Sequence, residues 1–148
     1  MILLKRKNIV VLLGPNLNMT GIREKGIYGE ETADKIKCQI IEYADSAGLS
    51  CEVFQTNFEG ALIDKIQEVR DDISGGIINA GALAHYSYCL RDAISAIRIP
   101  FVEVHMSNIY TREEFRSKSV IASVCVGQIT GFGKNSYFLG IDALKNII

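Results

Sequence analysis

Short apolar runs alternate with amphipathic stretches along the chain. The run over 8–13 is continuously apolar after Asn8, which is typical of a strand covered on both faces of a sheet. A further apolar run starts at Pro100, whose missing N–H suits the first position of a strand, and leads into His105. We predict strands over 8–13, 49–55, 76–79, the stretch before His105, and 120–129.

Helical periodicity fills the intervals between these strands. A helix over 32–47 is expected to start at Thr32 as its N-cap and to end before Gly48. A helix over 61–70 and a closing helix over 136–148 follow the same pattern, and the stretch from Asn79 to His85 is expected to turn into a helix that runs through Ile97. The inward faces of the first two helices are predicted to carry Ile36, Ile40, Ile41 and Ala44, and Leu62, Ile66 and Val69.

The resulting order βαβαβαβαβα predicts an α/β fold, with a parallel sheet of five strands and helices on both faces. The chain has 148 residues, 48% of them hydrophobic, so we expect one domain over 1–148. The net charge of −1 gives no reason to expect a nucleic acid or an anionic membrane as partner.

Targeting and redox signals are weak. No apolar run approaches the length of a membrane span, and the first residues place their charges after the apolar ones, the reverse of a signal peptide. The four cysteines are scattered singly, without a Cys-x-x-Cys pair, which favours free thiols in a cytoplasmic protein.

The segment from Pro100 to Asn108 changes abruptly from apolar to polar at His105. Glu103 lies two residues earlier, so in a strand both side chains point to one face of the sheet. A carboxylate beside an imidazole can fix its tautomer and favour its charged form. Ligands of open α/β sheets bind at the carboxyl ends of the strands, where Met106 and Ser107 follow. A strand end with polar caps and a satisfied histidine explains this segment alone about as well as catalysis does.

The stretch over 14–29 is long and glycine-rich for a connection between a strand and a helix, and long loops of this kind are usually functional or disordered. Its side chains that can take part in binding or catalysis are those of Asn16, Arg23 and Tyr28. A phosphate-binding loop of the usual form is excluded, because no Gly-Lys-Ser/Thr follows.

Later loops bring further polar groups to the same edge. Asn79 and His85 follow the third strand, and Asp92 would share a helix face with His85 if that helix started early enough. Thr111 starts a sequence with capping-box spacing, so a short helix is expected to carry Arg116.

These groups lack the spacing of the common metal and hydrolase motifs. There is no aspartate trio for magnesium, no three-ligand zinc cluster and no Gly-x-Ser-x-Gly elbow. The groups expected at this edge suit proton transfer on a polar, anionic small molecule, because they include a carboxylic acid, a phenol, two imidazoles, amides and arginines. Each residue alone also has a structural explanation, such as a loop anchor for Tyr28 or turn hydrogen bonding for Asn16 and Asn79. Their coincidence at one edge argues for a site.

Motifs across most of the chain resemble the type II 3-dehydroquinate dehydratases. The resemblance implies a flavodoxin-like fold, and dehydration of 3-dehydroquinate to 3-dehydroshikimate in the shikimate pathway, with neither metal nor organic cofactor. It also implies a homo-oligomer, a dodecamer built from trimers. The motifs are Gly14-Pro-Asn-Leu-Asn18, Arg23-Glu24, Tyr28-Gly29, Asn79-Ala-Gly-Ala-Leu-Ala-His85, Leu90-Arg-Asp-Ala93, Glu103-Val-His-Met-Ser-Asn108, Arg112-Glu-Glu-Phe-Arg116 and Gly131-Phe-Gly133.

The same resemblance implies residue roles. Tyr28 corresponds to the base and His105 to the acid. On physical grounds Arg23, from the same loop, can favour the phenolate of Tyr28, Glu103 can orient His105, and Asn16 can hold a water at the enolate oxygen. Asp92 corresponds to a residue that reaches a neighbouring subunit's site. Substrate binding falls to Asn79, His85, Met106, Ser107 and Arg116 in addition to Asp92. The chain departs from the family pattern at Leu13, Lys25, Ala80 and Ala84.

Two other classes of protein remain as alternatives. A flavodoxin-like module that binds a flavin is disfavoured by the lack of tryptophan and of a Ser/Thr-rich phosphate loop. A receiver-type signalling domain would need clustered aspartates after the first strand, where Leu13-Gly14-Pro15 has none.

Overall fold

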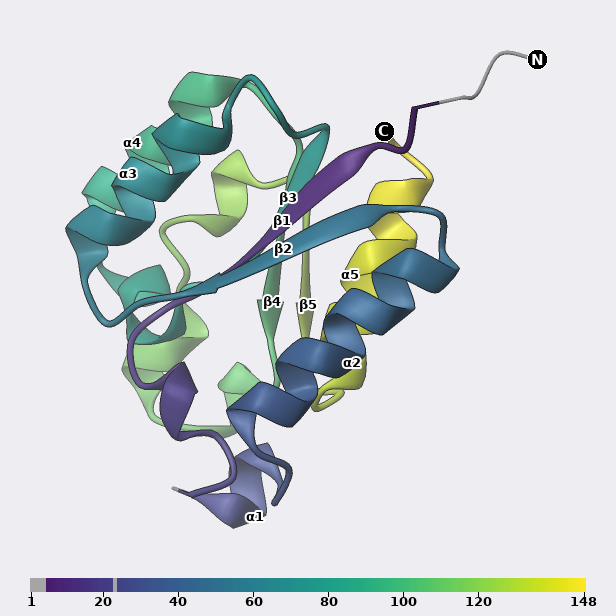
Figure 1. Ribbon diagram of the computed structural model, residues 1–148. Helices are drawn as coiled ribbons and strands as arrows, with labels where there is room; N and C mark the ends of the chain where they lie inside the picture. Colours follow the sequence, from purple (N-terminus) through teal and green to yellow (C-terminus); the bar gives the residue numbers. More distant parts are fainter. Residues whose placement is uncertain (1–4, 23) are drawn as a thin grey trace.

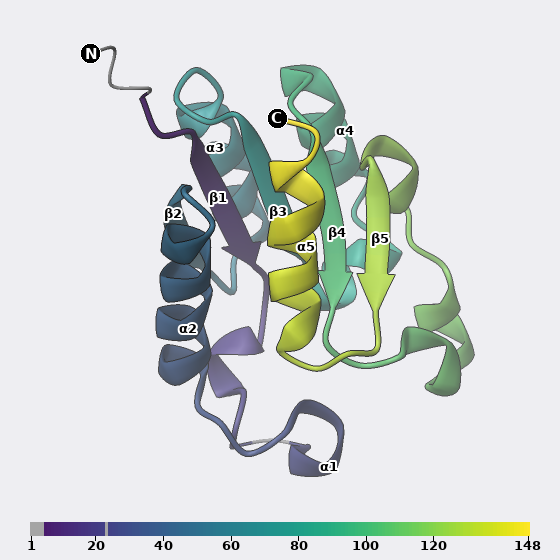
Figure 2. The ribbon, with the colours of Figure 1, turned by 90° about the vertical axis from the view of Figure 1, so that its right-hand side faces the viewer.

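A computed structural model describes residues 5–22 and 24–148 of the protein, and the side chain of Tyr28 also lies outside what it describes. Five parallel strands form one sheet in the order β2-β1-β3-β4-β5, with helices packed on both faces (Figures 1 and 2). The predicted fold class is therefore confirmed. The strands are β1 (Asn8–Leu13), β2 (Ser50–Gln55), β3 (Gly75–Asn79), β4 (Phe101–His105) and β5 (Gly127–Thr130).

Two helices cover each face of the sheet. Helices α2 (Ala33–Ser46) and α5 (Asn135–Lys145) pack on one face, and α3 (Glu59–Val69) and α4 (Tyr88–Ile97) on the other (Figure 2). Two apolar clusters fill the layers between helices and sheet, because the central strands are buried on both sides. A short helix α1 (Lys25–Tyr28) lies in the long connection after β1 (Figure 1). The 3₁₀ turns are η1 (Leu17–Met19), η2 (Gly81–His85), η3 (Ile109–Thr111), η4 (Glu114–Ser117) and η5 (Ala122–Val124).

Helix α2 follows its prediction with one exception. The Thr32 side chain caps it by accepting a hydrogen bond from the backbone N–H of Lys35 at 3.2 Å, and Gly48 follows it with φ of 83°. Ile41, predicted to face inward, is exposed, because it lies about 100° around the helix from the fully buried Ile40. In α3 the predicted inward residues Leu62, Ile66 and Val69 are all buried.

The helix predicted to run through Ile97 is present, but it begins after His85. Residues after β3 form the 3₁₀ turn η2, which begins at Gly81 with φ of 58°. The chain then extends, and α4 begins only at Tyr88, capped by Ser87, whose hydroxyl accepts the Leu90 N–H at 3.1 Å. His85 and Asp92 therefore do not share a helix face.

The fifth strand is shorter than predicted. Only Gly127–Thr130 pairs with β4, and the preceding residues carry the turn η5. Val120 donates its N–H to the carbonyl of Ala84 at 2.8 Å, and the fully buried Ile121 packs into the layer of α3 and α4. The apolar residues before Gly127, which were predicted to form a strand, are therefore apolar because they pack against the layer of α3 and α4.

The segment after β4 forms two 3₁₀ turns in place of one capped helix. Asn108 caps η3 by accepting the Tyr110 N–H at 3.2 Å, while the Thr111 hydroxyl donates to the Asn108 carbonyl at 2.8 Å. The predicted capping box at Thr111 is therefore wrong, although Arg116 does lie in the following turn η4.

Candidate active site

The carboxyl ends of β1, β3 and β4 meet where the strand order reverses, the usual ligand site of this topology. Gly14 ties the first two of these ends together by donating its N–H to the Asn79 carbonyl at 2.8 Å. A Cβ at Gly14 would lie 2.4 Å from the Ala80 carbonyl oxygen, so only glycine permits this approach. A narrow cleft at this edge is lined by Leu17, Asn79, Gly81, His85, His105, Met106, Ser107, Ile109, Arg112 and Arg116.

Glu103 and His105 form the centre of this site. They point to the same face of β4, as predicted, and Nε2 of His105 lies 2.6 Å from Oε1 of Glu103. The carboxyl group is fully buried and the imidazole is 5% exposed, so solvent screens this contact little. Because a carboxylate only accepts, Nε2 carries the proton, and Nδ1 is the ring nitrogen left for a ligand.

The loop after β3 supplies an amide and the second imidazole. Asn79 is buried, and its Nδ2 donates to the Tyr137 hydroxyl at 2.8 Å while its Oδ1 accepts the Gly81 N–H at 3.2 Å. His85 stacks against His105 with ring centroids 6.1 Å apart. These contacts fix the orientation of both side chains toward the cleft.

His85 is held by the segment that follows η4. Its Nδ1 lies 2.7 Å from the Lys118 carbonyl oxygen, which makes Nδ1 the protonated nitrogen of the neutral ring. Burial is the main cause that lowers the pKa of His85, and the charges of His105 and Arg116 act in the same direction. The hydrogen bond to Lys118 and the charge of Glu103 oppose this shift. The site therefore favours a neutral imidazole at position 85.

Two arginines contribute positive charge to the cleft. Arg116 donates from Nε to Oε2 of Glu113 at 2.6 Å and keeps a side chain that is 20% exposed. Arg112, which the sequence analysis left without a role, is more buried and lies 3.5 Å from the hydroxyl of Ser107. Its Nη2 is 3.6 Å from Glu24, so it also connects the cleft to the connection after β1. Two guanidinium groups at one edge favour an anionic ligand.

Met106 and Ser107, which directly follow His105 in the chain, are buried and line the cleft as predicted. Asn16 lies at the start of the first connection with φ of 69°, and its exposed side chain is not part of the cleft lining. Asp92 lies exposed on α4 and does not line the cleft of its own chain either. Arg23 and the side chain of Tyr28 lie outside the described residues, so their predicted roles stay predictions.

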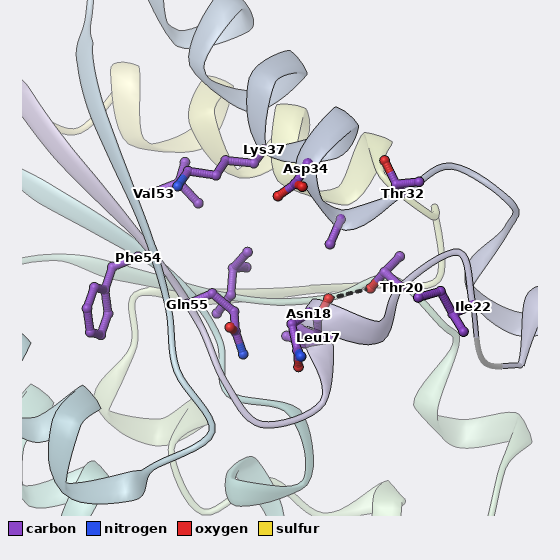
Figure 3. Close-up of a pocket in the computed structure, with 12 residues that line it drawn as sticks. Leu17, Asn18, Thr20, Ile22, Thr32, Asp34, Lys37, Val53, Phe54 and Gln55 are labelled. Atoms are coloured by element: carbon purple, nitrogen blue, oxygen red, sulfur yellow. Dashed lines mark hydrogen bonds between the residues drawn. The ribbon is translucent and has the colours of Figure 1, made fainter.

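A second pocket, of about 500 Å³, lies between the amino-terminal part of α2, the end of β2 and the segment over 17–22 (Figure 3). Asp34 and Lys37 border it from α2, and Gln55 from β2, while Leu17 contributes an apolar wall. The Glu103–His105 pair is not among its lining residues. Its size alone therefore does not mark it as the reaction site.

Neither a metal cluster nor a membrane span is found in the described part of the chain. Among residues 5–22 and 24–148 no three His, Cys, Asp or Glu side chains gather as metal ligands. No helix there is both long and apolar enough to cross a bilayer.

Two residues of the site, Arg112 and Ser119, were not predicted from the sequence. Arg112 lies four residues before Arg116, and this spacing was a usable signal because both arginines follow the end of β4. The hydroxyl of Ser119 lies within hydrogen-bonding distance of Glu103. Ser119 lies 16 residues from Glu103, and no spacing rule connects them.

The strand order and the site together define a flavodoxin-like α/β protein that presents a buried carboxylate–imidazole pair and two arginines at its switch point. The sequence pattern of the family described as dehydroquinase class II matches residues 7–145. The chain therefore belongs to the dehydroquinase class II family, and both the predicted family and the predicted class of enzyme are confirmed.

Individual relatives agree with this assignment. A 3-dehydroquinate dehydratase of a Nitratiruptor species is 54% identical over 139 residues, covering 94% of this chain and 89% of the relative. That of Caldicellulosiruptor saccharolyticus is 53% identical over 143 residues, covering 96% and 99%. The crystal structure of type II dehydroquinase from Butyrivibrio crossotus superposes with a TM-score of 0.92 at 48% identity, covering 94% of this chain and 97% of that one.

Proposed function

We propose that the protein is a 3-dehydroquinate dehydratase, which converts 3-dehydroquinate to 3-dehydroshikimate and water in the shikimate pathway, as a cytoplasmic enzyme without a metal or organic cofactor. The observation that carries this proposal is the buried Glu103–His105 contact of 2.6 Å at the switch point of a chain from this family. An oriented imidazole and two arginines suit acid catalysis on a carboxylate-bearing substrate.

The reaction removes a proton alpha to a ketone and a hydroxyl group from the beta carbon. In our proposal the Tyr28 phenolate accepts the alpha proton, and the electron pair of the broken C–H bond forms an enolate. Collapse of the enolate expels the hydroxyl group, which leaves as water with a proton from the His105 imidazolium. The buried Glu103 carboxylate orients that imidazolium and offsets its charge.

A phenol is a weak base near neutral pH, because its ordinary pKa is about 10. Arg23 comes from the same connection as Tyr28, and a guanidinium beside the ring would favour the phenolate. Asn16 would hold a water against the enolate oxygen, a role that requires the first connection to close over the cleft.

Substrate recognition would use the lining of the cleft. Arg116 can bind both oxygens of the substrate carboxylate through its fork once it leaves Glu113, and Asn79, His85 and Ser107 would meet the hydroxyl groups. The cleft as described has room for little more than a water molecule, about 20 Å³, so a ring-sized substrate requires the arginines and the first connection to move. Met106 would contribute its backbone.

We further propose that the chain assembles as a dodecamer built from trimers, in which Asp92 approaches the site of a neighbouring subunit. Asp92 is exposed on α4 and does not line its own cleft, which fits a role across an interface.

Purified protein incubated with 3-dehydroquinate is expected to generate the conjugated enone of 3-dehydroshikimate, followed by its ultraviolet absorbance. A His105→Ala variant serves as the control and should be nearly inactive. Failure of the parent protein to form the enone at saturating substrate would refute the proposed reaction. A coloured protein with bound flavin would favour the alternative of a flavodoxin-like binding module.

A further inference from the structure

The carboxylate that orients the reacting imidazole has a second partner outside β4. The Ser119 hydroxyl lies 2.8 Å from Oε1 of Glu103 and 2.9 Å from Oε2. Since Glu103 is fully buried, each contact replaces hydration that the charged carboxylate lost on folding. His105 and Ser119 together therefore hold the carboxylate from two directions.

The Ser119 hydroxyl is itself oriented. Its oxygen accepts the Ala122 N–H at 3.0 Å, so its proton is directed away from that bond and toward Glu103. The segment is anchored independently, because Val120 donates its N–H to Ala84 and Arg91 donates to the Val120 carbonyl at 3.0 Å. Loss of the hydroxyl should therefore leave the position of the backbone unchanged.

The electrostatic surroundings make this contact consequential. Burial, followed by the charge of Glu103, raises the pKa of the Cys125 thiol to about 12, so this neighbour stays neutral. The cleft beside the pair also contains His85, from η2, and Arg112 and Arg116, from the segment after β4. Among the described contacts, the hydrogen-bond donors to the Glu103 carboxylate are His105 and Ser119.

We propose that Ser119 is a positioning residue of the site: its hydroxyl fixes the Glu103 carboxylate, and through it the ring and the Nε2–H tautomer of His105. Ser119 does not touch the reacting atoms. It acts by keeping one carboxylate oxygen in line with Nε2, so that Nδ1 faces the cleft.

The direct test uses NMR, because the chain has only two histidines. In a His85→Asn background His105 is the single imidazole, and its ¹⁵N shifts report which nitrogen carries the proton. We expect a hydrogen-bonded, downfield Nε2–H signal when Ser119 is present. With Ser119→Ala added, that signal should move upfield or broaden and the tautomers should mix. Ser119→Thr, which keeps a hydroxyl, should restore it.

The kinetic test assumes the proposed dehydratase activity. Ser119→Ala is expected to lower kcat about 10- to 100-fold, the scale of one lost charge-assisted hydrogen bond, with KM nearly unchanged. Ser119→Thr should recover most of kcat. Ser117→Ala is the matched control, since its exposed hydroxyl bonds only to the Glu114 carbonyl among the described contacts.

The two tests separate the possible failures. An unchanged Nε2–H signal and unchanged kcat in Ser119→Ala would overturn the role of Ser119. Equal losses in the alanine and threonine variants would overturn it as well, because the hydroxyl would not be the cause. If the parent protein lacks dehydratase activity, the proposed function fails, while the NMR comparison still decides whether Ser119 positions His105.

Discussion

Two histidines share one site, yet their ring nitrogens meet different partners. His105 contacts the buried Glu103 carboxylate, whereas Nδ1 of His85 faces a backbone carbonyl, that of Lys118. Burial is the largest cause that lowers the pKa of His85 from its ordinary 6.5. The site thus combines an imidazole held by a carboxylate with one whose surroundings favour its neutral form.

The lowered pKa of His85 predicts a pH dependence of stability. Below pH 6.5 the unfolded chain binds a proton at this histidine before the folded chain does, so stability falls as the pH drops toward the folded pKa. Above pH 6.5 this contribution is constant. The free energy of unfolding, measured in urea, should therefore fall more for the parent than for His85→Gln when the pH is lowered from 7.5 to 5. A difference that does not change with pH would contradict the assignment of a partly buried, neutral His85.

The two proposed proton transfers can be uncoupled by substitution. In His105→Gln the base remains, so the enolate should still form, while expulsion of the hydroxyl group without an acid slows by about 10²–10⁴-fold. In heavy water, substrate on this variant should gain deuterium at the alpha carbon faster than it dehydrates. Tyr28→Phe should lose both reactions, and Arg23→Ala should recover partly as the pH rises.

The measurement is deuterium uptake by NMR alongside enone formation by absorbance. Normal exchange by Tyr28→Phe would show that another group removes the proton. Dehydration by His105→Gln at the parental rate would show that another group, or water, supplies the acid.

Among the elements, those with a regular period were predictable and those without were not. The Glu103–His105 pair followed from the two-residue period of a strand, and the caps of α2 followed from Thr32 and Gly48. The stretch over 109–126 contains three 3₁₀ turns, and Val120, Ile121 and Val124, in and before the last of them, pack against the layer of α3 and α4. This stretch also contributes Arg112 and Ser119 to the site: the spacing of Arg112 from Arg116 was a usable signal, whereas the contact of Ser119 with Glu103, 16 residues away, is encoded by no local pattern.

Two ion pairs connect the segment after β1 to other elements. Glu24 meets Arg112 at 3.6 Å, and Glu31 meets Lys134, in the turn before α5, at 2.6 Å. The second contact also explains why the pKa of Glu31 is lowered, with its hydrogen bond to Lys134 as the main cause. The Glu31–Lys134 pair therefore stabilises the position of this segment at neutral pH. Its contribution is lost as the pH falls below 4.5 through the lowered pKa of Glu31.

Breaking this contact should expose the segment to proteases. Lys134→Met is expected to speed trypsin cleavage after Arg23 or Lys25 about 2- to 5-fold, a modest effect because both partners are partly exposed. Lys35→Met is the control, since Lys35 lies 4.0 Å from Glu31 and is well exposed. A saturating substrate analogue should slow cleavage in each protein. Equal rates with and without the analogue would contradict closure of this segment over the cleft.

Two glycines test how tightly the elements pack. A Cβ at Gly76 in β3 would lie 2.2 Å from the buried ring of Phe101, so Gly76→Ala should destabilise the protein by about 1–3 kcal/mol or more. Gly60 lies in α3 with no atom within 4 Å of such a Cβ, so Gly60→Ala should be neutral or stabilise by up to about 1 kcal/mol. Thermal unfolding measures both, and a reversed order would contradict the strand contact.

At the scale of the whole molecule, the site lies beside an exposed aromatic surface, which we define as Tyr86, Tyr88 and Phe115. All three side chains are more than half exposed, and Phe115 meets the ring of His85 edge-on at 6.0 Å. Apolar surface of this kind is more typical of a subunit interface than of an isolated chain. Asp92 follows Tyr88 by one helical turn on α4, so an adjacent subunit covering this surface would also meet Asp92.

Asp92→Ala should therefore affect assembly and catalysis together. If Asp92 completes a neighbouring site, the variant should show a smaller mass in gel filtration with light scattering and a lower kcat, and both should recover partly at higher protein concentration, because association follows mass action. Asp64→Ala removes the same kind of side chain from the exposed surface of α3 and should change neither quantity. A fully active monomer would show that each chain completes its own site. An intact oligomer with reduced kcat would instead confine Asp92 to the chemistry, because the subunits would then associate without it.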